Sequence, residues 1–241
     1  MGAKGSFDDH LQLMSSLTAR RENAKVHSYK HSFSGFAARL SEAEAQSLAQ
    51  YPRVVSIFPN PVFQLHTTRS WDFLRDQYEF VRDLPYSSGS NSTSLNGADT
   101  IIGIFDTAIR PESESFTDKG IGPVPSRWKG TSTRGYDFKP SSCKRKLIGA
   151  RFYDEPGEYN PPYVGTPRDH DGHGTHVTAI AAGSPVADAS YYGLAGGTAT
   201  GGSPGSRIAV YRVCKPNAGC SGSATMKAFD DARADGVDII N

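Results

Sequence analysis

The feature that most constrains the fold is an apolar run at residues 100–106, Thr-Ile-Ile-Gly-Ile-Phe-Asp, which ends in an aspartate. Its apolar residues do not alternate with polar ones, so both faces of the strand are predicted to be buried, as in parallel sheets. Further strand-like segments lie at 146–153, 207–214 and 237–241. A Gly-rich loop is expected at 193–205, and a helix that Gly236 ends is expected at 223–235. Strands that alternate with helices predict an α/β fold with a doubly wound parallel sheet.

A second constraint comes from residues 169–183, which place three of the seven histidines in a loop before a stretch of small and apolar residues. We expect a helix at 176–182, with Gly183 as its C-terminal stop. The acidic residues Asp169 and Asp171 are expected to cap the N-terminus of this helix. A histidine is thereby delivered next to the first turn of a helix.

A zinc site is the alternative interpretation of these histidines, because His170, His173 and His176 recur every three residues. Metal-binding pairs on one helical face prefer a separation of four residues, with a base such as glutamate between them. Gly172 and Gly174 also disfavour a continuous helix through this stretch. We therefore expect no metal or other cofactor here. His176 is predicted to be a buried, hydrogen-bonded helix residue and His170 a surface loop residue.

Asp106 is a candidate catalytic carboxylate, and one of the three histidines at 170–176 is its candidate partner. Reactive groups in open parallel sheets collect at the carboxyl ends of strands, and Asp106 stands at such an end. There a carboxylate can accept a histidine ring N–H, fix the tautomer and stabilise the imidazolium. A histidine held in this way can act as a general base and afterwards as a general acid. Taken alone, Asp106 is more simply explained as a turn or N-cap aspartate.

The first 66 residues predict a separate small α+β module, with helices on one face of an antiparallel sheet. Ser41 and Glu44 have the spacing of a capping box at the start of a helix that Pro52 ends. The other predicted elements are an amphipathic helix at 7–23, a strand-like run at 26–40 bent at residues 34–35, and strands at 54–58 and 62–65.

Together these motifs resemble a known family. The His-Gly-Thr-His sequence at 173–176 and the aspartate that closes residues 100–106 are similar to the histidine and aspartate motifs of subtilisin-like serine proteases. Residues 29–40 and 54–59 resemble the inhibitor prodomain of plant subtilases, and residues 66–74 resemble its junction with the mature enzyme. The likeness is strongest to secreted plant subtilases of the carbon-dioxide-response type.

This resemblance implies a ferredoxin-like prodomain at 1–66 and the N-terminal half of a subtilisin-like catalytic domain at 67–241. In that domain it implies that Asp106 and His173 are the catalytic aspartate and histidine. It implies cleavage between His66 and Thr67, a peptide or protein substrate, and a prodomain that binds its own catalytic domain. Secretion to the apoplast is implied too, although the sequence as written opens without the apolar core of a signal peptide. The net charge of +1 gives no indication of nucleic acid binding. No run approaches the roughly 18 apolar residues of a membrane span.

Several positions depart from the family pattern. Ala108 replaces a glycine, which is costly if the backbone there needs a positive φ. Arg110 replaces a tryptophan and removes a large apolar contact. The stretch after 128–130 lacks the cysteine that the family usually pairs, so Cys143 has no obvious partner.

Two further sequence features fit a secreted protein. Cys214 and Cys220 flank a turn that they could bridge. Asn91 begins an Asn-Ser-Thr glycosylation sequon in a polar loop.

The resemblance places three catalytic elements after residue 241: a strand that binds the substrate backbone, the oxyanion-hole asparagine and the nucleophilic serine of a Gly-Thr-Ser motif. We therefore expect a serine endopeptidase precursor by family, represented by a fragment that is inactive alone. Two alternatives stay open. One is a catalytically inactive, prodomain-bearing regulator or inhibitor of related proteases, and the other is a non-functional remnant.

Overall fold

The structure is a computed structural model that describes residues 25–63, 97–154, 165–216 and 218–241. The predicted helix at 7–23, the cleavage site at His66 and Thr67, and the sequon at Asn91 lie outside these residues.

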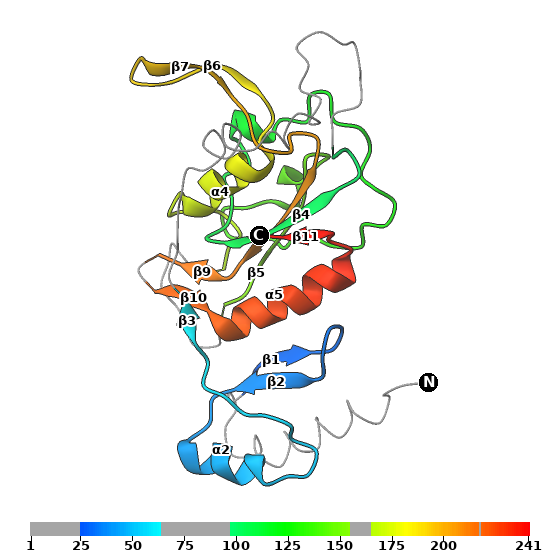
Figure 1. Cartoon of the computed structure of the whole chain (residues 1–241), viewed down its shortest axis with the longest axis vertical. Helices are drawn as coiled ribbons and strands as arrows, with labels where there is room; N and C mark the ends of the chain where they lie inside the picture. Colours follow the sequence, from blue (N-terminus) through cyan, green and yellow to red (C-terminus); the bar gives the residue numbers. More distant parts are fainter. Residues whose placement is uncertain (1–24, 64–96, 155–164, 217) are drawn as a thin grey trace, which may run out of the picture.

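A parallel sheet with the strand order β11-β4-β8-β5 forms the centre of the larger unit (Figure 1). Its strands are β4 (Ile101–Asp106), β5 (Leu147–Phe152), β8 (Arg207–Arg212) and β11 (Ile239–Ile240). All three neighbouring pairs are parallel, and β4 and β8 are in register along their whole length. The predicted parallel α/β sheet is therefore confirmed.

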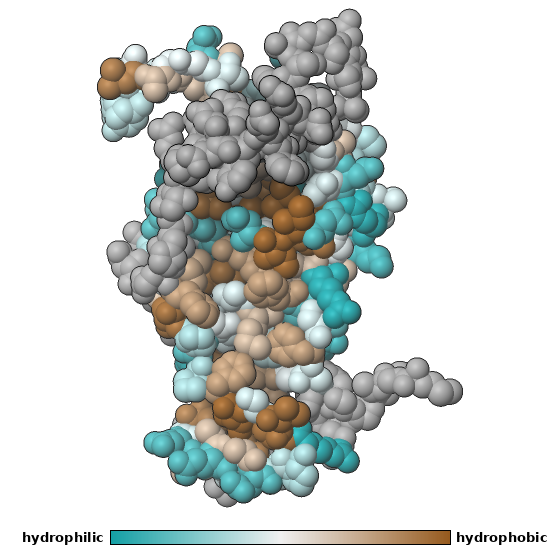
Figure 2. Space-filling view, viewed as in Figure 1, coloured by the Kyte–Doolittle hydropathy of each residue, from teal (hydrophilic) through white to brown (hydrophobic). Residues whose placement is uncertain are grey.

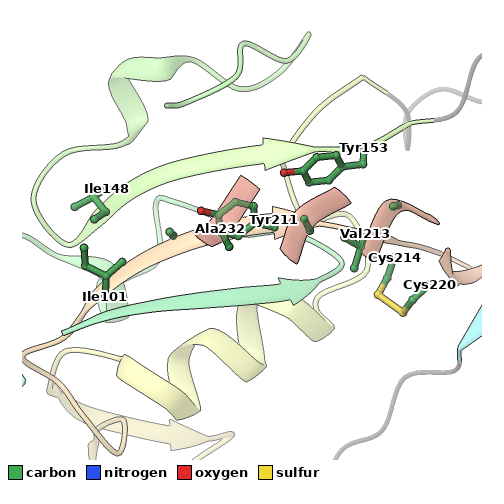
Figure 3. Close-up of a cluster of buried hydrophobic side chains, with 11 residues drawn as sticks. Ile101, Ile148, Tyr153, Tyr211, Val213, Cys214, Cys220 and Ala232 are labelled. Carbon is green, nitrogen blue, oxygen red and sulfur yellow. A yellow bond between two sulfur atoms is a disulfide. The ribbon is translucent and has the colours of Figure 1, made fainter. Parts of the chain in front are cut away.

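Helices α4 (His173–Ala182) and α5 (Gly222–Asp235) lie on opposite faces of this sheet (Figure 1). Side chains of β4 alternate between two buried clusters even though its sequence does not alternate. Ile104 belongs to the cluster that contains residues of α4, and Ile101 to the one that contains residues of α5 (Figure 3). Burial of each such isoleucine contributes about 1.5–3 kcal/mol, which explains the unbroken apolar run.

Helix α4 begins three residues earlier than the sequence predicted, at His173 instead of His176. Its N-cap, Gly172, has a left-handed backbone with φ of 105°. Gly174 lies inside this helix. The position requires a glycine because a Cβ there would be 2.4 Å from the carbonyl oxygen of Ala108. Gly174, which disfavours a helix by its propensity, is thus needed for a close approach of two backbone segments. That approach is set by the tertiary structure.

Helix α5 agrees closely with its prediction. The Ser221 hydroxyl accepts a hydrogen bond from the Ala224 N–H at its start, and Gly236 ends it in a left-handed conformation. Two short 3₁₀ helices occupy Glu114–Phe116 and Pro140–Ser142. None of the helices in the described residues is long and apolar enough to cross a lipid bilayer.

The glycine-rich segment after α4, predicted as a loop at 193–205, is partly a β-hairpin. Strands β6 (Val186–Tyr191) and β7 (Leu194–Ala199) pair antiparallel, and the hairpin projects from the body at the upper left of Figure 1. Its two-residue turn has positive φ at both Tyr192 (50°) and Gly193 (82°), as a type I′ turn requires. The sequence did not predict β7 because this strand is rich in glycine and has no alternation of apolar and polar residues.

Within residues 25–63, the smaller unit contains a β-hairpin and the helix α2. Strands β1 (Lys25–Tyr29) and β2 (Gly35–Ala38) pair antiparallel, with the predicted bend between them. Helix α2 (Glu42–Ala49) begins with the predicted capping box: the Ser41 hydroxyl accepts from the Glu44 N–H, and the Glu44 carboxylate accepts from the Ser41 N–H. The helix ends before Pro52, as expected.

The predicted strand at 54–58 is wrong. This segment forms no strand, and Val55 within it is fully exposed. A strand needs a neighbour for its backbone groups, and β1 and β2 pair only with each other in the described residues. Figure 2 shows apolar residues gathered at this end of the molecule. Within this segment the large exposed apolar residues are Val55, Ile57 and Phe58, and Tyr51 just before it is exposed as well.

Candidate active site

The structure brings Asp106 and His173 together at the carboxyl end of the sheet. Asp106 is the last residue of β4 and His173 the first of α4. The His173 Nδ1 atom lies 2.8 Å and 2.9 Å from the two carboxylate oxygens of Asp106. Because an ionised carboxylate only accepts, Nδ1 carries the proton, and Nε2 is left as the basic nitrogen of the ring.

Local contacts hold both partners. The Thr107 N–H donates to Asp106 Oδ1 at 2.6 Å, and Asp106 is only 6% exposed. At the start of α4, the Asp171 carboxylate accepts from the His173 N–H and the Asp169 carboxylate accepts from the Thr175 N–H. Both acidic residues therefore cap the helix as the sequence predicted.

The other two histidines of this stretch have separate environments. His170 Nε2 lies 2.9 Å from Asp137 Oδ2 and 3.1 Å from the Tyr136 hydroxyl. His176 is exposed, so its predicted burial is wrong. The reason is the earlier start of α4, which turns Gly174 and Thr178 towards the protein and His176 away. The three histidines do not share one site.

The two family departures next to Asp106 have different structural outcomes. Ala108 is fully buried with φ of 110°, a conformation that costs an alanine strain. Arg110 makes polar contacts with the helix start: its N–H donates to the Thr175 hydroxyl and its Nε donates to the Asp169 carbonyl. Arg110 thus forms local hydrogen bonds in place of an apolar contact, whereas Ala108 leaves strain in the backbone.

The edge of a short strand holds a segment of the smaller unit. Strand β10 (Gly219–Ser221) pairs antiparallel with β9 (Cys214–Lys215) on one side and with β3 (Val62–Phe63) on the other. The Gly222 N–H also donates to the Pro61 carbonyl at 2.8 Å. A segment of the smaller unit is therefore bound in extended form by strand addition.

A disulfide joins Cys214 to Cys220 across the β9–β10 pair (Figure 3). Both cysteines belong to the buried cluster under α5, and the bond links β10 to β9, which follows β8 in the chain. The spacing of these two cysteines was the one sequence signal for the β9–β10 element, which is otherwise too short and polar to predict.

The smaller unit also docks on helix α5. The Asp230 carboxylate is fully buried and accepts hydrogen bonds from three consecutive backbone N–H groups, at Lys30 (2.9 Å), His31 (2.5 Å) and Ser32 (2.6 Å). Burial alone would raise the pKa of Asp230, but these bonds and Lys227 lower it below its usual value. The buried carboxylate thus remains ionised and holds the β1–β2 turn.

Comparison with known proteins agrees with this architecture. Residues 2–66 match the family described as peptidase inhibitor I9, and residues 97–241 match the subtilase family. The chain belongs to the subtilase family. It is 55% identical over 230 residues to the CO(2)-response secreted protease of Arabidopsis thaliana, which covers 95% of this chain and 29% of that protein. Subtilisin-like protease SBT5.1 of the same plant is 53% identical over 242 residues, 98% of this chain and 31% of its own. The chain thus spans about 30% of the length of these relatives.

The nucleophile motif expected of a subtilase, Gly-Thr-Ser, occurs in this chain as a tripeptide at 130–132. Ser132 forms an isolated parallel bridge with Ala150 on β5, and its side chain lies near the thiol of Cys143, whose pKa it lowers against the effect of burial. In the sheet order, β5 lies two strands from β4, which carries Asp106. Ser132 is therefore engaged away from the Asp106–His173 pair and is not a candidate nucleophile.

Proposed function

We propose that this subtilase is the precursor of a secreted, extracellular serine endopeptidase, with Asp106 and His173 as two members of its catalytic triad. The observation that carries the proposal is the hydrogen bond from His173 Nδ1 to the Asp106 carboxylate, at 2.8 Å, at the carboxyl end of a parallel sheet. The names of the two Arabidopsis relatives, a secreted protease and a subtilisin-like protease, support the same reaction class.

In this mechanism Asp106 keeps the proton on Nδ1, so that Nε2 of His173 accepts the proton of a serine hydroxyl as the serine attacks the peptide carbonyl. The imidazolium formed is stabilised by the Asp106 carboxylate and later gives its proton to the leaving amine. Strand β10 offers backbone groups that hold an extended substrate. No residue of this pair needs a metal or an organic cofactor.

We propose further that residues 1–66 are an inhibitory prodomain, that 67–241 belong to the catalytic domain, and that cleavage falls between His66 and Thr67. Support comes from β3, which occupies the edge of β10 as an extended peptide would. Asp230 holds the same unit at a second place, through the N–H groups of residues 30–32. Asn91 is proposed as a glycosylation site of the secreted protein.

The test starts from the transcript, which is sequenced through both ends of this reading frame. If the frame continues into a further Gly-Thr-Ser motif after residue 241, the encoded protein should cleave peptides. His173→Ala should then lower kcat by about 10⁴-fold or more. Retained activity in His173→Ala would contradict the proposal. Residues 1–241 expressed alone should show no turnover, because Ser132 is engaged elsewhere.

A regulator or inhibitor of related proteases is the second candidate function. The contacts of residues 29–32 and 60–63 with α5 and β10 favour it, because they require no catalytic serine. If the transcript ends at Asn241, the 241-residue chain should reduce peptide hydrolysis by an active subtilase in a dose-dependent way. Unchanged hydrolysis would leave the non-functional remnant as the remaining explanation.

A further inference from the structure

Asp169 is a buried carboxylate next to the candidate catalytic pair that the mechanism above does not use. Its side chain is 1% exposed, and its two oxygens accept five hydrogen bonds. Oδ1 accepts from the Thr107 hydroxyl (3.0 Å) and from the N–H groups of Asp171 (3.0 Å) and Gly172 (2.8 Å). Oδ2 accepts from the N–H and the hydroxyl of Thr175.

All five partners are donors, so this site is suited to an ionised carboxylate. Burial by itself raises the pKa of Asp169, but the hydrogen bonds from Gly172, Thr175 and Thr107 outweigh burial and lower the pKa below its usual value. A neutral amide of the same shape would place two N–H donors against donors, and a buried unpaired donor costs about 1–3 kcal/mol. The charge of Asp169 therefore has a structural function here.

Thr107 connects this carboxylate to the catalytic pair. Its hydroxyl donates to Asp169 and accepts from the Gly174 N–H at 2.8 Å, while its own N–H donates to Asp106 Oδ1. The hydroxyl is thus bonded to the residue that follows His173, and the backbone is bonded to the partner of the His173 ring. Asp169 closes the network by holding the first turn of α4 at Thr175.

We propose that Asp169 is a positioning residue for catalysis, which acts with Thr107 to hold the start of α4 against the end of β4. The hydrogen bonds of Asp169 and Thr107 thereby set the distance between His173 Nδ1 and the Asp106 carboxylate. The inference rests on the proposed function of that pair, but it concerns their geometry and not the turnover of substrate.

The experiment measures the His173 Nδ1–H proton by NMR in the uniformly ¹⁵N-labelled 241-residue chain. The resonance is assigned by its absence in His173→Ala. Asp169→Asn and Thr107→Val are the test variants. Thr107→Ser is the conservative variant that keeps the hydroxyl. Asp235→Asn is the matched control, because Asp235 is also buried but binds Arg151 and Tyr211.

The expected result is that Asp169→Asn and Thr107→Val move the resonance upfield or broaden it beyond detection. Thr107→Ser and Asp235→Asn should leave it in place. An unchanged resonance in both test variants would overturn the proposal. If Asp169→Asn does not fold by circular dichroism, the comparison of Thr107→Val with Thr107→Ser decides.

Failure here is distinct from failure of the proposed function. The resonance reports the geometry of the pair whether or not peptides are cleaved. The proposed function fails instead when a chain with the serine motif keeps its activity in His173→Ala.

Discussion

Gly174 packs against the backbone of Ala108 so closely that a Cβ added to Gly174 would lie 2.4 Å from the Ala108 carbonyl oxygen and 2.8 Å from its nitrogen. Both atoms belong to the main chain, so neither side can yield by rotating a side chain. This contact brings the first turn of α4 onto the end of β4, and it is the steric reason that His173 reaches Asp106.

Gly174→Ala should therefore destabilise the protein by about 1–3 kcal/mol, because overpacking outweighs the better helix propensity of alanine. The His173 Nδ1–H resonance should be lost in the same variant. Thermal unfolding and NMR measure the two effects. Gly196→Ala is the control, since no atom lies within 4 Å of a Cβ built there. Equal stability of the two variants would refute the steric argument.

Ala108→Gly should stabilise the protein. At φ of 110° an alanine carries backbone strain of about 1–3 kcal/mol, whereas the added flexibility of glycine in the unfolded chain costs about 0.5–1 kcal/mol. The net gain of about 1 kcal/mol corresponds to a rise in Tm of about 2–4 °C for a chain of this size. Ala228→Gly, a buried alanine inside α5, should lower Tm instead. A lower Tm for Ala108→Gly would show that the strain is compensated.

Ser132→Cys should form a disulfide with Cys143. The Ser132 side chain lies close enough to the Cys143 thiol to lower its pKa, although burial raises that pKa to about 11. A disulfide that closes a loop of this size contributes about 2–3 kcal/mol to the free energy of unfolding. Mass spectrometry of unreduced peptides and thermal unfolding test this, with Thr133→Cys as the control. Two free thiols at these positions after oxidation would contradict the prediction.

Asp230→Asn should loosen the prodomain. Hydrogen bonds to a charged acceptor contribute about 1.5–3 kcal/mol, so amide exchange at residues 30–32 should speed up by about tenfold or more. Hydrogen exchange measures this, and Asp231→Asn, on the same helix but bonded to Tyr153 and Lys227, should leave these amides protected.

The same contact predicts a pH dependence. The pKa of Asp230 is lowered in the folded chain, so its contribution is present above the usual aspartate pKa of 3.8 and is lost as the pH falls through the lowered value. The amides of residues 30–32 should therefore stay protected at pH 5. Loss of protection between pH 6 and pH 5 would assign the release to other groups.

The buried Lys146 leads us to expect a second dependence of the free energy of unfolding on pH. Its sign is opposite to that for a lysine paired with a carboxylate. Its side chain is fully buried, and its ammonium donates to the carbonyls of Pro204 and Ser206. Burial, with Arg207 nearby, lowers its pKa to about 7 from 10.5. Between these values the unfolded chain binds more protons, so the free energy of unfolding should rise with pH, by up to about 1.4 kcal/mol per pH unit.

Chemical denaturation at several pH values measures this slope. Lys146→Met should remove the Lys146 contribution between pH 7 and pH 10. An identical slope in Lys146→Met and in the unchanged chain would show that Lys146 keeps its ordinary pKa.

Local sequence determined much of the fold and of the candidate site. The apolar run of β4, the capping box at Ser41 and the C-terminal glycine of α5 each act within a few residues, and the structure has them as predicted. The likeness to the subtilase motifs singled out Asp106 and His173 as partners, and these residues lie in hydrogen-bonding contact in the structure.

Only the tertiary structure decided the features that depend on residues distant in sequence. The start of α4 depends on Ala108, 66 positions before Gly174. The edge of β10 becomes a binding strand because β3 lies beside it, and the segment at 54–58 fails as a strand because it has no such neighbour. Asp169 looked like one more capping acid, but its buried bonds to Thr107 and Thr175 make it a link between β4 and α4. Propensities and caps are local energies that can be read along a chain, whereas backbone contact and strand pairing exist only once distant segments meet.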